Sequence, residues 1–172
     1  MFIDINGTSV KTPRFLVKKA AKFYGEYLMG KKLAENVNLT IDFKRFDDNS
    51  RDYAYCDWID DNHRSRVFVI TIDRNLSKKE TFLALAHEMV HHEQNTKGIL
   101  KYIPTTNTNE DSHLDKLERE AYEKGNIMFR NWTDSLEKQP LKENKETNIQ
   151  DLAYNKISGL LEKGIENELE FI

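Results

Sequence analysis

Apolar residues recur every three or four positions in four stretches of the chain, and this spacing predicts four helices. They are expected at about 13–29, 78–96, 112–132 and 149–172. In the last of them, the apolar residues stand four apart. Most of the polar positions between them are charged, as is usual for helices with one face in solvent.

Capping signals mark where these helices begin. Thr12 precedes Pro13, which predicts an N-cap followed by the first helical residue, and Gly30 marks the end of that helix. Ser77 and Glu80 have the spacing of a capping box, in which each side chain binds the other residue's backbone N–H. Ser112 and Asp115 repeat this signature at the third helix.

Three segments alternate or concentrate apolar residues in the manner of strands. Residues 37–43 alternate regularly, 53–58 are aromatic and alternate, and 67–72 are almost continuously apolar. Turn-forming residues separate them. We therefore expect an α+β fold: a small, mostly antiparallel sheet of about three strands, mostly hairpin-connected, packed against the helices.

Length and local composition indicate one domain followed by a linker and a C-terminal helix. The chain has 172 residues, enough for one core and too few for two ordinary domains. We expect the domain at 1–132, a polar linker at 133–148, and the helix at 149–172 beyond it. We favour packing of this C-terminal helix on its own domain over docking to a partner.

Charge and cysteine content exclude several classes of protein. The net charge is −3 with both signs interleaved, so a nucleic acid is an unlikely partner. The single cysteine, Cys56, excludes an internal disulfide or a cysteine-rich zinc site. The sequence shows neither a signal peptide nor an apolar run long enough for a membrane span, so we expect a cytoplasmic protein. The oligomeric state is not predicted.

The residues His87-Glu88-Met89-Val90-His91 carry the strongest chemical signal. Four residues turn a helix by about 400°, so both imidazoles leave the same face one turn apart. Two ligands of one tetrahedral zinc ion need this geometry. Glu88 lies about 100° further round, beside such an ion, where a carboxylate can act as general base on a zinc-bound water. The alternative is that these are two surface histidines of an amphipathic helix with no metal-binding role.

A catalytic zinc ion usually has three protein ligands, so a third is expected on the next helix. Glu118 lies close to that helix's apolar face, whereas Glu120 points away from its centre, so Glu118 is the preferred ligand and Glu120 the alternative. His92 projects away from His91 and is expected at the surface. His113 opens the third helix and is the remaining candidate, at the rim of the site.

Three blocks of this sequence together resemble the gluzincin metallopeptidases, in the minimal form found in bacteria and phages. The blocks are VFVITID, FLALAHEMVHHEQ and LEREAYEKG, within roughly residues 53–130. The third is similar to the family's Glu-x-x-Ala ligand helix, a pattern that also selects Glu118. The resemblance implies a few antiparallel strands against two or three helices, with an edge strand beside the zinc that pairs with substrate. The segment 53–58 is the candidate for that strand.

One position departs from the resembled pattern. Several gluzincin families have Asp or Asn after the alanine, where this chain has Tyr122. An acidic residue there could orient a ligand histidine, so that role is left to Glu120 or a backbone carbonyl. Tyr122 itself either donates to the developing oxyanion or only packs.

These observations predict a zinc-dependent metallopeptidase with His87, His91 and Glu118 as ligands of one Zn²⁺ and Glu88 as base, acting on a peptide or protein. The first alternative is a catalytically inactive zinc-containing binding or regulatory protein that uses its C-terminal helix. The second is a DNA-linked protease resembling the SprT-like proteins. Those commonly have a third histidine ligand and a basic or cysteine-rich tail, which this chain lacks.

Overall fold

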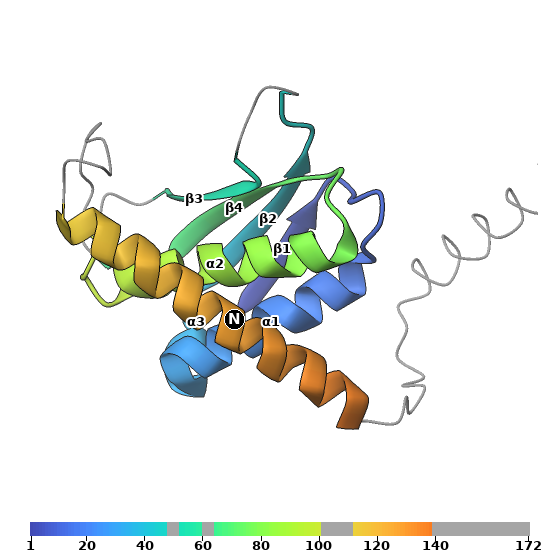
Figure 1. Ribbon diagram of the computed structural model, residues 1–172. Helices are drawn as coiled ribbons and strands as arrows, with labels where there is room; N and C mark the ends of the chain where they lie inside the picture. Colours follow the sequence, from blue (N-terminus) through green and yellow to red (C-terminus); the bar gives the residue numbers. More distant parts are fainter. Residues whose placement is uncertain (48–51, 60–63, 101–111, 139–172) are drawn as a thin grey trace, which may run out of the picture. The chain divides into compact units, whose positions relative to one another are not determined.

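A four-stranded mixed sheet and three helices make up the part of the chain that the computed structural model describes, residues 1–47, 52–59, 64–100 and 112–138 (Figure 1). All of these residues belong to one unit, Met1–Lys138. Its elements in chain order are β1 (Phe2–Asn6), α1 (Arg14–Ala34), β2 (Asn38–Lys44), β3 (Ala54–Trp58), β4 (Val67–Asp73), α2 (Lys78–Thr96) and α3 (Ser112–Lys138). The α+β class is confirmed.

The sheet differs from the predicted one in strand number and direction. Its order is β1-β2-β4-β3, so it has four strands where about three were expected. β1 pairs with β2 and β2 with β4 in parallel, and only β3 with β4 is antiparallel, so the prediction of a mostly antiparallel sheet was wrong. Parallel strands need a long crossover, and α1 provides it between β1 and β2.

Strand β1 is the element that the sequence pattern did not reveal. Its five residues alternate, with Ile3 buried and Asp4 exposed, and Ile3 lies opposite Leu39 of β2. Five residues are too few for the alternation to stand out. The strand gains its stability from pairing with β2.

One face of the sheet forms the centre of the hydrophobic core. Alternate residues of β2 and β4 are buried on it: Leu39, Ile41, Phe43, Phe68, Ile70 and Ile72. α1 and α2 pack against the sheet, and α3 packs on α2 and α1 (Figure 1). Burial of alternate residues on one side is the pattern of a sheet covered by helices on a single face.

The helix starts agree with the capping signals in one case and not in another. α2 has the predicted bounds. α1 begins at Arg14, and Pro13 is its N-cap without a side-chain hydrogen bond. The predicted cap, Thr12, instead lies with its hydroxyl 3.3 Å from that of Thr81 in α2. Gly30 has a φ of 72° and interrupts α1, which continues to Ala34.

Helix α3 extends beyond its predicted end near Trp132, to Lys138. No glycine or proline occurs between Asn126 and Pro140, so nothing in the chain stops the helix earlier. Residues 133–138, assigned to the polar linker, are therefore helical. The rest of that linker and the predicted C-terminal helix lie outside the described residues. Within the described ranges, no helix is both long and apolar enough to cross a membrane.

Candidate metal centre

The motif residues lie in the middle of α2, which has a well-defined start. The Ser77 hydroxyl accepts a hydrogen bond from the Glu80 backbone N–H at 3.2 Å, and the Glu80 carboxylate accepts one from the Ser77 N–H at 2.8 Å. This confirms the capping box. Because α2 is regular from there onward, His87 and His91 project one turn apart, and both are partly buried.

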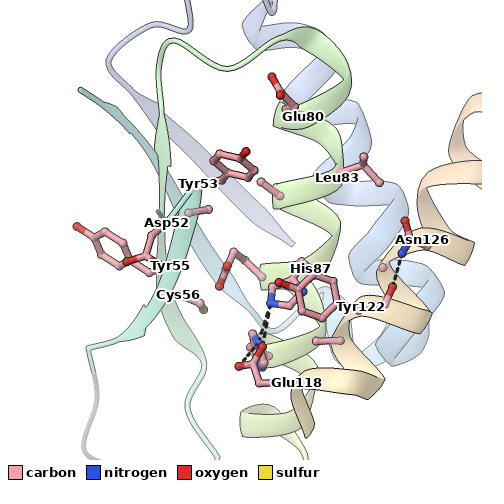
Figure 2. Close-up of a pocket in the computed structure, with 16 residues that line it drawn as sticks. Asp52, Tyr53, Tyr55, Cys56, Glu80, Leu83, His87, Glu118, Tyr122 and Asn126 are labelled. Atoms are coloured by element: carbon pink, nitrogen blue, oxygen red, sulfur yellow. Dashed lines mark hydrogen bonds and ion pairs between the residues drawn. The ribbon is translucent and has the colours of Figure 1, made fainter. Parts of the chain in front are cut away.

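His87 and His91 of α2 and Glu118 of α3 converge at the junction of the two helices. Figure 2 shows His87 and Glu118 at this junction. The Nε2 atoms of the two histidines are 3.1 Å apart. The Glu118 carboxylate lies 3.4 Å from Nε2 of His87 and 3.2 Å from Nε2 of His91. Donor atoms arranged tetrahedrally at about 2.0–2.1 Å from zinc are about 3.4 Å from one another. These three residues therefore have the spacing needed to hold a metal ion.

The structure distinguishes between Glu118 and Glu120, the two candidates for the third metal ligand. Glu118 faces both histidines, and its hydrogen bonds to them hold the pKa of its carboxyl well below the usual range. Burial lowers the pKa of His91, but hydrogen bonding and the charge of Glu118 outweigh this, so the pKa is raised. Glu120 binds Lys124 and Gln94 instead, at 2.6 and 3.2 Å.

Glu88 lies beside this cluster and is buried, with only 7% of its surface exposed. Burial raises the pKa of its carboxyl, while the charges of His91 and His87 partly lower it. Its side chain is not one of the three that converge. It lines the adjoining pocket together with His87, His91 and Glu118.

Two pockets meet at the cluster. The larger has a volume of about 620 Å³ and lies between β3, α2 and α3. Figure 2 shows Tyr53 and Tyr55 on its β3 side and Tyr122 on its α3 side. The smaller, of about 190 Å³, adds three leucines: Leu100, Leu114 and Leu117. Both pockets share Cys56, Glu88, His91 and Glu118, so a ligand in either would reach the cluster.

His87 is held in place mainly by packing. The Tyr122 ring lies 4.6 Å from its ring, centroid to centroid, and Gly125 of α3 lies against its backbone. Its Nδ1 atom is buried and has no hydrogen-bond partner among the described residues. Tyr122 is otherwise 64% exposed, at the rim of the larger pocket.

The two other histidines among the described residues lie away from the cluster. His92 was expected at the surface, but it is fully buried, with its ring 3.7 Å from that of Phe68, and burial lowers its pKa to about 3. The burial of His92 could have been predicted from its spacing. It follows Leu85 by seven residues and Met89 by three, which places it on the buried side of α2. His113 is exposed and outside the cluster.

Gln94 is the site residue that sequence reasoning did not identify. The sequence predicts that Glu120 or a backbone carbonyl orients a ligand histidine. In the structure, Oε1 of Gln94 lies 2.9 Å from Nδ1 of His91. The signal was its position three residues after His91, on the same side of the helix.

Comparisons with protein-family models, with curated proteins and with solved structures found no match to this chain. The arrangement of its own residues is therefore the basis for a functional proposal.

Proposed function

We propose that this protein is a zinc metallopeptidase of the gluzincin type, with His87, His91 and Glu118 as the metal ligands. The observation that carries the proposal is the convergence of these three side chains beside a buried carboxylate, Glu88, at the wall of a 620 Å³ pocket. Two histidines and one glutamate are a ligand set of known catalytic zinc sites.

Zinc is the metal that best fits the donor atoms. Two imidazole nitrogens disfavour calcium and magnesium, which prefer oxygen ligands at coordination numbers of six or more. The separations of 3.1–3.4 Å between the donor atoms suit a small ion with tetrahedral coordination.

The proposed mechanism assigns proton transfer to Glu88. A zinc ion bound by the three ligands would polarise a substrate carbonyl and lower the pKa of a water molecule. Glu88 accepts the proton of the attacking water and passes it to the leaving amine. Its burial supports this role, because a carboxylate with a raised pKa is a stronger base.

The proposed substrate is an extended peptide segment lying along β3. Among the strands that the structure describes, β3 pairs with β4 alone and is an edge of the sheet. Its residues 54–56 line the larger pocket. An edge strand offers unpaired backbone groups to a peptide that adds to the sheet. Pairing with β3 would place the peptide backbone alongside Glu88 and the ligand cluster.

The test is a comparison of zinc content and peptide hydrolysis in wild type and Glu88→Gln. We expect the variant to keep its zinc and to hydrolyse a mixed peptide library about 10²- to 10⁴-fold more slowly, the range typical of a general base. Glu123→Gln is the matched control, since Glu123 is an exposed residue of α3 away from the pocket lining.

Wild-type turnover by Glu88→Gln would show that Glu88 is not the base. A wild-type protein that binds zinc and cleaves no peptide would favour the alternative, a zinc-containing binding or regulatory protein.

A further inference from the structure

The Gln94 side chain occupies the seam between α2 and α3 directly behind His91. It is almost fully buried, at 1% exposure, and all three of its hydrogen bonds are inside the protein. A buried amide is stable only when its donors and acceptor are paired, so these contacts determine how it is oriented.

The orientation of the amide follows from its neighbours. Its nitrogen lies 3.1 Å from the Leu117 carbonyl oxygen and 3.2 Å from a carboxylate oxygen of Glu120, both of which only accept hydrogen bonds. The NH₂ group therefore faces α3, and the amide oxygen faces His91.

This orientation determines which nitrogen of His91 is directed at the metal site. The amide oxygen, 2.9 Å from Nδ1, accepts a hydrogen bond, so Nδ1 carries the proton. Nε2 is the atom that faces His87 and Glu118, so its lone pair points at a metal ion whenever one is bound there. The ring is held in the protonation form and direction that a metal ligand needs.

The Gln94 amide also links α3 to α2 by a hydrogen bond next to Glu118, the third proposed ligand. Leu117, whose carbonyl accepts its hydrogen bond, directly precedes Glu118. Glu120 is itself held by Lys124 at 2.6 Å, and Lys124 also contacts buried Glu93 of α2 at 3.2 Å. Gln94 thus joins the two helices at the level of the metal ligands, with a charged cluster supporting it.

We propose that Gln94 is the positioning residue of this metal centre. It orients His91 through Nδ1 and holds the segment of α3 that carries Glu118. The inference rests on the metal binding in the proposed function and is independent of the reaction that follows.

The first test measures zinc affinity by competition with a chromophoric chelator. Gln94→Met keeps the length of the side chain and removes its three hydrogen bonds, and we expect its zinc dissociation constant to rise about 10- to 100-fold. Asn95→Leu is the matched control. It also removes a buried, hydrogen-bonded amide of α2, but Asn95 binds Ser65 and Leu100 rather than the cluster, so its affinity should stay at the wild-type level.

The second test distinguishes positioning from general stability. In the zinc-loaded protein, the ¹H and ¹⁵N shifts of the His91 ring and the solvent exchange of its Nδ1–H report the hydrogen bond at Nδ1. We expect a hydrogen-bonded, slowly exchanging Nδ1–H in wild type and in Asn95→Leu, and a rapidly exchanging one in Gln94→Met. The double variant Gln94→Glu with Glu120→Gln exchanges acceptor and donor within the contact between these two side chains, and it should recover the hydrogen-bonded Nδ1–H and part of the lost zinc affinity.

Each outcome has a distinct meaning. A wild-type protein that binds no zinc would overturn the metal centre and this inference together. If wild type binds zinc, and Gln94→Met shows the same zinc affinity and the same His91 Nδ1–H signal, then Gln94 has no positioning role and the proposed function still stands. An equal loss of affinity in Asn95→Leu would show that the effect is not specific to Gln94.

Discussion

Gly125 of α3 lies directly against the backbone of His87 in α2. A Cβ atom at position 125 would come within 3.2 Å of the His87 nitrogen and 3.3 Å of its Cα. Both are backbone atoms of a packed helix, so they cannot move aside as a flexible side chain can. The glycine therefore allows the close helix contact that brings Glu118, two turns earlier on α3, to the histidines.

Gly125→Ala should weaken both stability and metal binding. The change gains about 1 kcal/mol in helix propensity and costs about 1–3 kcal/mol in overpacking, so we expect a net loss of about 1 kcal/mol by urea unfolding. Zinc affinity should fall because Glu118 moves with α3. Gly25→Ala in α1 is the control, since the added Cβ meets only the flexible ends of Met1 and Met89. Equal behaviour of the two variants would contradict this account.

The ligand assignment predicts a graded series of metal contents after dialysis. His87→Ala, His91→Ala and Glu118→Ala should retain almost no zinc, since each removes one of the three converging donors. Glu120→Ala should retain zinc with reduced affinity, because Glu120 is not a ligand and is linked to His91 through Gln94. Full zinc content in Glu118→Ala would reject Glu118 as a ligand.

Cys56 should react slowly with thiol-specific reagents in the metal-free protein. Burial raises the pKa of its thiol well above the usual value, and the charges of Glu88 and Asp57 raise it further, so little reactive thiolate forms. We expect a slower reaction than in the urea-unfolded chain, and a modest acceleration in Glu88→Gln. Equal rates in folded and unfolded protein would rule out a shielded thiol.

His92 should make the stability of the metal-free protein depend on pH. Its pKa is lowered from 6.5 to about 3 by burial, so the folded state binds fewer protons than the unfolded state between these values. The stability contributed by neutral His92 is complete above 6.5 and is lost as the pH falls toward 3. Between pH 7.5 and 5.5, we expect wild type to lose about 1.4 kcal/mol more than His92→Leu in urea unfolding with chelator. An equal loss in both would mean that His92 is accessible to protons.

The centre of the site could be predicted from sequence because it depends on local geometry. Helical spacing alone places His87 and His91 together, and the facing of α3 selects Glu118. The contacts made by Gln94 and Gly125 depend on how closely α2 and α3 approach, and no local pattern gives that distance. The prediction of a surface position for His92 was wrong, because His92 lies on the same side of α2 as the buried residues Leu85 and Met89.

The fold was predictable in its elements and not in their pairing. The strand at Val67–Asp73 and the helix at Lys78–Thr96 have strong local patterns, and both were recovered. β1 and β2 are parallel because α1 crosses between them, and β2 and β4 are parallel because the intervening β3 runs back at the far edge of the sheet. The pairing therefore depends on the whole chain path. We expected hairpins because the segments between the strands are rich in turn residues. Such residues indicate where the chain reverses direction, but they do not indicate which strands pair.

The three converging side chains come from two helices, α2 and α3. A metal ion at the site would therefore cross-link these helices in addition to its proposed catalytic role. A ligand that binds only the folded state at one hundred times its dissociation constant adds about 2.7 kcal/mol to stability. The lifetime of the folded protein would then follow the supply of free zinc. When zinc is scarce, the contact between α2 and α3 would weaken. The stability of the fold would then depend on the same ion as the proposed catalytic activity.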